Sequence, residues 1–108
     1  MKLWIDDIRP APEGYVWCKS VNEAKEKIID SERQSKVPRM YDCDFRFTVI
    51  DMDHDAGDYV SAGGDYIKLL DWFEETGRNY PIRIHSANPV GIENMRRIIK
   101  KNNWKEIL

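Results

Sequence analysis

Three short apolar runs, each ended by acidic or imidazole side chains, constrain the fold of this chain most strongly. The runs cover residues 2–5, 47–50 and 81–84 and are rich in Ile, Val, Phe and Trp. Short apolar runs followed by polar, Gly- or Pro-containing sequence are typical of buried parallel strands. A further run, residues 15–19, alternates aromatic and small residues and also predicts a strand. The sequence therefore predicts a sheet of at least four strands.

Helical signals alternate with these strands. Ser20 and Glu23 form a capping box that predicts a first helix over about residues 21–31. An apolar face at i, i+3, i+4 and i+7 spacing predicts a second helix, with Asp65 as its cap and Gly77 as its stop. The last helix is expected to carry Pro89 in its first turn.

The polar stretch before the third strand reads as a surface connection whose side chains could reach a ligand; these are Lys36, Arg39 and Tyr41.

The connection between the first two strands is unusually short. About nine residues separate them, whereas a parallel crossover needs a dozen or more. Either the two strands are antiparallel, or a loop replaces a helix. The element order predicts an α/β three-layer fold with a mostly parallel sheet of four to five strands. The tail after the last helix is too short for a full strand and helix.

Length and composition point to a single domain spanning residues 1–108. Charged residues make up 33% of the chain, and no apolar run approaches the roughly 20 residues of a membrane span. The net charge of −2 favours neither extended nucleic-acid binding nor a membrane surface. Cys18 and Cys43 are expected to be reduced thiols, and the chain is expected to be cytoplasmic.

Four carboxylates follow two of the predicted strands. Asp6 and Asp7 come after the first strand, and Asp53 and Asp55 come after the third. Ligands of open α/β sheets bind outside the carboxyl ends of the strands, so these side chains are expected to converge. Clustered carboxylates repel one another unless they hold a proton or a cation, and Mg²⁺ prefers oxygen ligands. The sequence therefore predicts a magnesium site, the alternative being acids that simply face water at strand ends.

A phosphate site is predicted beside these acids. Ser86 and Asn88 precede the last helix, where the helix dipole and free N–H groups favour an anion. Arg9, in the loop after the first strand, adds a planar donor for phosphate. The alternatives are that Ser86 or Asn88 is only the helix N-cap, and that Arg9 only pairs with Asp7 or Asp55.

Both histidines of the chain, His54 and His85, fall at this edge. One could act as general base and the other as general acid, the pairing that opens a cyclic phosphodiester. Either could instead be structural, or bind zinc together with the acids, although no cysteine lies nearby. Asp51 and Asp53 also spell the DxD motif of aspartate-nucleophile phosphatases, but that motif is expected after a first strand.

The sequence resembles two related families at these positions. The acid pair, the acid after the third strand and Ser86 resemble the response-regulator receiver domain, a flavodoxin-like fold. The segments LWIDDIRPAPEGYVW, DMDHDAGD, GGDYIKLLDWFEE and IHSANPVGIENM resemble the narrower cyclic-phosphate processing receiver-like family across nearly the whole chain. The resemblance implies that Asp6 and Asp7 are the acidic pair, Asp53 is the counterpart of the phosphoacceptor and Ser86 is the hydroxyl position. It also implies that the motifs of the narrower family include His54, Asp55, His85, Asn88 and Arg9.

The chain departs from a complete receiver in lacking the first helix and the last strand–helix unit. Of the lysines, only Lys105 stands near the place where a receiver carries one after its fifth strand.

Three functions stay open. The chain is expected to be a stand-alone receiver-like domain that acts on or senses a cyclic phosphate or nucleotide phosphate ester, with Mg²⁺ as cofactor. As a metal-assisted phosphoesterase it would use Asp53, His54 and His85, and its partner would be a phosphate-containing small molecule or an RNA end. Alternatively it accepts a phosphoryl group on Asp53 as a signalling module, or it binds a nucleotide without turnover.

Overall fold

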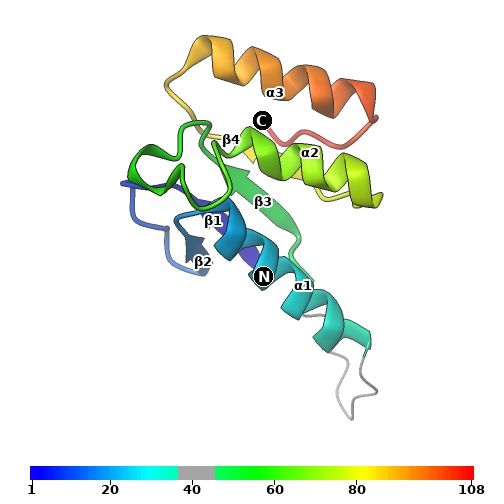
Figure 1. Ribbon diagram of the computed structural model, residues 1–108. Helices are drawn as coiled ribbons and strands as arrows, with labels where there is room; N and C mark the ends of the chain where they lie inside the picture. The colour runs from blue at the N-terminus through cyan, green and yellow to red at the C-terminus, as the bar shows by residue number, and fades with distance from the viewer. Residues whose placement is uncertain (37–45) are drawn as a thin grey trace.

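A four-stranded parallel sheet forms the centre of the computed structural model, which describes residues 1–36 and 46–108 (Figure 1). The strands lie in the order β2-β1-β3-β4. Their bounds are β1 (Lys2–Ile5), β2 (Tyr15–Cys18), β3 (Val49–Met52) and β4 (Ile82–Ile84). The described helices are α1 (Val21–Lys36), η1 (Gly57–Tyr59, a 3₁₀ turn), α2 (Ile67–Thr76) and α3 (Pro89–Lys101).

The predicted receiver-like α/β arrangement is confirmed, and the direction of β2 is resolved. β1 pairs with β2 in parallel, with Lys2 opposite Tyr15 and Ile5 opposite Cys18. A loop covers residues 6–14, so it replaces the helix that normally joins two parallel neighbours. The predicted absence of the first helix is therefore correct.

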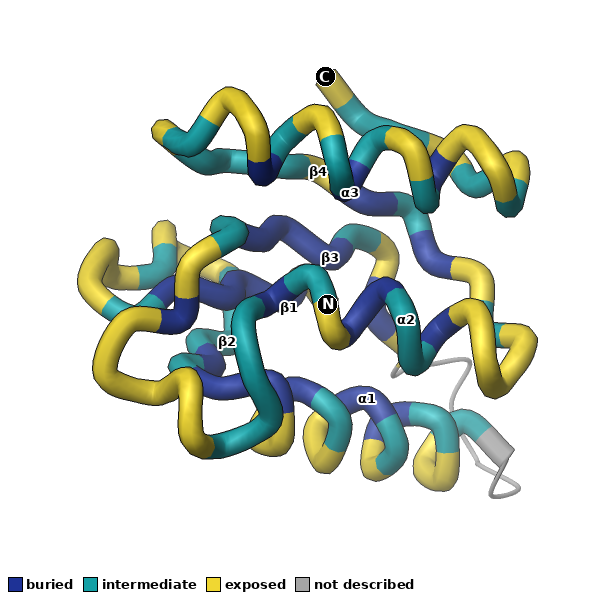
Figure 2. Tube along the Cα trace, turned by 45° about the horizontal axis from the view of Figure 1, so that its top comes forward, coloured by how far each residue is buried: buried dark blue, intermediate teal, exposed yellow. Residues whose placement is uncertain are grey.

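The three α-helices lie on one face of the sheet (Figures 1 and 2). Each contacts the next, and together they cover the alternate strand residues of the core, among them Leu3, Ile50 and Ile82. Because no helix joins β1 to β2, the described helices form a single layer where the complete sandwich has two. The opposite face, here called the open face, carries the other strand residues: Trp4, Trp17, Asp51 and Arg83.

Helix α1 begins as predicted and ends later. The Glu23 N–H donates to Ser20 Oγ over 3.1 Å, as the capping box requires. The helix continues to Lys36, with the hydroxyls of Ser31 and Ser35 bonded to carbonyls of the preceding turn. Arg39, Tyr41 and Cys43, together with the side chain of Lys36, lie outside the described residues, so the predictions for them stay predictions.

The ends of the other elements follow the expected signals with two exceptions. Gly77 ends α2 in the left-handed conformation, with φ of 69°. Asp65, however, does not cap α2, because its carboxylate accepts from the N–H of Ala56 in the preceding loop. Strand β3 also lies two residues further along than predicted, so Asp51 stands inside it and points to the open face.

The C-terminal tail lies along β4. The Ile82 N–H donates to Lys105 O, and the Ile107 N–H donates to Ile82 O. Lys105 is therefore beside the start of β4, at the opposite end of this strand from His85. None of the described helices is long and apolar enough to span a membrane.

Candidate metal and phosphate site

Three carboxylates meet at the carboxyl edge of the sheet, as predicted. Asp6, Asp7 and Asp53 each place one oxygen within 4.8 Å of the others. Asp6 and Asp7 follow the central strand β1, and Asp53 follows its neighbour β3, with the Asp53 N–H donating to Ile5 O. Their convergence is thus a direct result of strand order.

Asp6 is the enclosed member of this acidic cluster, with 1% of its side chain exposed. Its Oδ1 accepts from the N–H groups of Ile8 and Arg9, both over 2.8 Å. Its Oδ2 lies 3.0 Å from His85 Nε2 and 3.9 Å from Arg9 Nε. The protein itself holds both Asp6 oxygens, whereas Asp7 and Asp53 are only partly buried.

The pKa of Asp7 reflects the repulsion within the cluster. Burial raises the pKa of its carboxyl, and the nearby charges of Asp6, Asp53 and Asp58 raise it further against an opposing backbone hydrogen bond. Gly57 provides the space that Asp7 occupies, since a Cβ at this position would overlap the Asp7 carboxylate. An oxygen-only cluster with mutual repulsion fits a hard divalent cation, because the cation would both use these oxygens as ligands and cancel the repulsion.

Asp55 does not belong to this cluster, which corrects the prediction that it is a fourth ligand. Its carboxylate accepts from His54 Nδ1 over 2.8 Å and lies 3.4 Å from the Asn88 side-chain nitrogen. The loop after β3 therefore sends Asp53 toward β1 and Asp55 toward the start of α3. Because an ionised carboxylate only accepts, the contact requires a proton on His54 Nδ1, so in the neutral ring Nε2 is the acceptor nitrogen.

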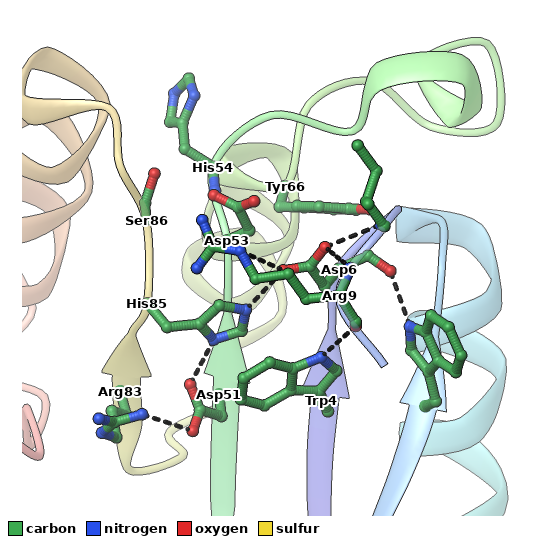
Figure 3. Close-up of polar contacts among 12 residues, drawn as sticks. Trp4, Asp6, Arg9, Asp51, Asp53, His54, Tyr66, Arg83, His85 and Ser86 are labelled. Atoms are coloured by element: carbon green, nitrogen blue, oxygen red, sulfur yellow. Dashed lines mark hydrogen bonds and ion pairs between the residues drawn. The ribbon is translucent and has the colours of Figure 1, made fainter. Parts of the chain in front are cut away.

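His54 is held against the start of α3. A Cβ at Gly91 would lie 2.5 Å from His54 Cγ, so the ring packs directly on the glycine backbone. Figure 3 shows the ring beyond Asp53, directed away from Asp6. His54 thus borders the acidic cluster without being part of it.

His85 reaches the site from the other side, at the end of β4. Both of its ring nitrogens lie against carboxylates, Nε2 on Asp6 and Nδ1 on Asp51 at 2.5 Å. The ring stacks on Trp4 with centroids 3.7 Å apart and planes within 6°. The two predicted histidines therefore have unlike surroundings: among the described residues nothing bonds His54 Nε2, whereas carboxylates contact both ring nitrogens of His85.

Of the predicted phosphate residues, Arg9 lies beside Asp6 of the cluster, and Asn88 has a structural role. Asn88 is the N-cap of α3, since its Oδ1 accepts from the Gly91 N–H over 3.0 Å. The Asn88 N–H in turn donates to Ser86 Oγ. Figure 3 shows Ser86 just past the end of β4, at the same edge of the sheet as Asp53 and His54. The Arg9 guanidinium is half exposed above Asp6.

Sequence reasoning missed the polar residues of the open face. Asp51 and Arg83 face each other in the β3–β4 register, and Trp4 is opposite Asp51 in the β1–β3 register. The signal was the alternation of Ile50, Asp51 and Met52, which directs the one polar side chain to the other face of the sheet from the two apolar ones. Extending the third strand by two residues would have revealed it.

A parallel sheet with an acid pair after β1, an acid after β3 and a hydroxyl after β4 defines the receiver class of α/β domains. Within that class, the chain belongs to the family described as the cyclic-phosphate processing receiver domain, whose model matches residues 1–101. No curated protein and no solved structure matches the chain.

Proposed function

We propose that this chain is a magnesium-dependent phosphoesterase that opens a cyclic phosphate on a nucleotide or at an RNA end. One observation carries the proposal: the cluster of Asp6, Asp7 and Asp53 lies beside a histidine, His54, that a carboxylate orients. The family description points to the same class of substrate. A net charge of −2 favours a small ligand over an extended nucleic acid.

Asp6, Asp7 and Asp53 would hold the cation, with Asp6 the ligand that the protein itself fixes through hydrogen bonds. A bound Mg²⁺ neutralises charge on a phosphate and positions it for attack. The Ser86 hydroxyl and the Arg9 guanidinium are the donors placed to receive the phosphate oxygens. The start of α3 adds the positive end of a helix dipole to the same side.

His54 is the residue proposed to move protons. In the reaction, water adds to phosphorus, one cyclic ester P–O bond breaks, and the released oxygen takes up the proton that the attacking water gives up. His54 Nε2 accepts the proton of the attacking water, because Nδ1 is already bonded to Asp55. A base that is itself oriented by a third group is the usual arrangement at such sites.

The test is incubation with Mg²⁺ and a panel of 2′,3′-cyclic, 3′,5′-cyclic and cyclic-dinucleotide phosphates, with products separated by chromatography. Asp53→Asn and His54→Gln should each reduce product formation by at least about 100-fold. Asp58→Asn, an exposed carboxylate in the same loop, is the control and should retain activity. Ligand bound but recovered unchanged would identify a sensor or sequestering protein instead.

Phosphoryl acceptance on Asp53 is the second candidate function. It is favoured by the position of Asp53 at the end of β3 within the acidic cluster. The position of Lys105 beside Ile82 weighs against it, because this lysine lies at the wrong end of β4 to contact a phosphoryl group on Asp53. Incubation with acetyl phosphate and Mg²⁺, followed by intact mass measurement, decides the question: a phosphoryl adduct that Asp53→Asn abolishes would support signalling.

A further inference from the structure

A chain of four polar side chains runs from the open face to the acidic cluster. Arg83 Nη1 donates to Asp51 Oδ2 over 3.0 Å, and the other Asp51 oxygen contacts His85 Nδ1. His85 Nε2 then contacts Asp6 Oδ2 (Figure 3). Only Arg83, with 45% of its side chain exposed, reaches solvent to any extent.

His85 is enclosed, so little of its ring is accessible to a ligand. Its side chain is 8% exposed, and Trp4 covers one face of the ring. Asp6 and Asp51 each have 1% of their side chains exposed, so both nitrogen contacts are shielded from water. Buried hydrogen bonds to charged groups are stronger than exposed ones and fix geometry more firmly.

Three of these side chains, those of Asp6, Asp51 and His85, lie in enclosed positions where apolar side chains would be expected to pack. Burying two carboxylates is costly unless each is hydrogen-bonded, and here both are. If Arg83, Asp51 and His85 served only to pack this face, His85 would not need to contact Asp6. This contact is made to the one cluster member whose remaining oxygen is also held, by two backbone N–H groups.

We propose that His85 is a positioning residue, which fixes the Asp6 carboxylate so that the acidic cluster is already formed before a divalent cation binds. Asp51 and Arg83 hold the ring, and Trp4 sets its plane. His85 thus acts through Asp6 rather than on the ligand. The inference rests on the proposed function only in requiring that a cation binds at this cluster.

Two amide variants of the whole chain separate this role from simple packing. His85→Gln places its terminal nitrogen where Nε2 stands and keeps the donor to Asp6. His85→Asn places its amide where Nδ1 stands and keeps only the contact with Asp51. Outer residues that orient metal ligands change affinity by about 10- to 100-fold when they are replaced. Calorimetric titration with Mg²⁺ alone should therefore show a dissociation constant about 10-fold or more weaker for Asn, and within about 3-fold of the unmodified chain for Gln.

The outcomes are distinct. Equal losses in the two variants, or a larger loss in Gln, would overturn the positioning role, and so would unchanged Mg²⁺ affinity in both. If the unmodified chain binds no Mg²⁺, the proposed function fails and this inference fails with it. Circular dichroism and thermal melting in EDTA establish that each variant is folded before titration, and Asp51→Asn, which loosens the ring from behind, supplies an independent variant expected to weaken Mg²⁺ binding.

Discussion

Replacing Asp7 with asparagine should make the metal-free protein more stable. Asp7 lies within 4.8 Å of two other carboxylates, and two unit charges at that distance repel by about 3.5 kcal/mol at an effective dielectric of 20. Because Asp7 is only partly buried and salt screens it, we expect a measured gain of about 1–2 kcal/mol at low ionic strength. For a domain of this size that corresponds to a rise in melting temperature of about 4–8 °C.

The gain should depend on pH in a defined direction. The pKa of Asp7 is raised from its usual 3.8, so the folded state binds this proton more tightly than the unfolded state does. The cost of Asp7 is therefore absent at low pH and develops as the pH rises through the raised value. The difference between Asp7→Asn and the unmodified chain should vanish near pH 3 and be complete at pH 7.

In excess Mg²⁺, the unmodified chain should instead be more stable than Asp7→Asn. A ligand at 100 times its dissociation constant stabilises by about 2.7 kcal/mol, and only the unmodified chain retains the full ligand set. Thermal melts in EDTA and in excess Mg²⁺ test both halves. Asp58→Asn is the comparison variant: Asp58 is exposed and outside the cluster, and its charge is the weakest of the three that raise the pKa of Asp7, so its gain should be much smaller. An equal gain from Asp58→Asn, or none from Asp7→Asn in EDTA at pH 7, would refute the electrostatic reasoning.

Three further predictions concern two glycines at the site and an ion pair away from it. Gly91→Ala should displace the His54 ring and lower turnover of a cyclic phosphate by at least about 10-fold while Mg²⁺ affinity stays unchanged; loss of both in parallel would contradict the separation of the two sites. Gly57→Ala should weaken Mg²⁺ binding by about 10-fold in calorimetry, because its Cβ overlaps the Asp7 carboxylate, whereas Gly14→Ala, also at positive φ but in open space, should not. Glu32→Gln should cost about 1–3 kcal/mol in urea unfolding at pH 7. Burial alone would raise the pKa of Glu32, but hydrogen bonds from Arg78 and Tyr80 lower it overall. The stabilisation by the ionised Glu32 is therefore present above pH 4.5 and is lost as the pH falls through the lowered pKa. A stability difference between Glu32→Gln and the unmodified chain that persists unchanged at pH 3 would argue against this reasoning.

Most of the fold was predictable because the hydrophobic periodicity agrees with the residues that cap and end the helices. The capping box at Ser20, the stop at Gly77 and Pro89 at the start of α3 are local signals that set helix ends without help from the rest of the chain. The convergence of Asp6, Asp7 and Asp53 was also predictable, since strand order alone brings them together. The helix ends depend on spacing of two to four residues, and the convergence depends on the strand order that parallel α/β sheets share.

What could not be predicted depends on contacts between distant segments. Alternation along β3 predicts the face on which Asp51 lies, but only the contacts of Asp51 with His85 and Arg83 make a buried carboxylate favourable there. The direction taken by Asp55 likewise depends on Asn88 and His54. No property of the β3 segment alone distinguishes Asp53, which joins the cluster, from Asp55, which leaves it.

The short β1–β2 connection also has a consequence for the order of folding. Lys2 and its partner Tyr15 are 13 residues apart in the sequence, whereas Lys2 and Val49 are 47 apart, and closing the longer segment costs about 1 kcal/mol more. We therefore expect β1 and β2 to associate early and β3 to join later, as parallel pairing between distant segments is slow. Asp6 and Asp7 would then be ordered in the folding nucleus, whereas Asp53 would arrive only as the chain commits to its native state. The three carboxylates would then come together only in the final step of folding. Because a divalent ion would bind only after that step, it should mainly slow unfolding.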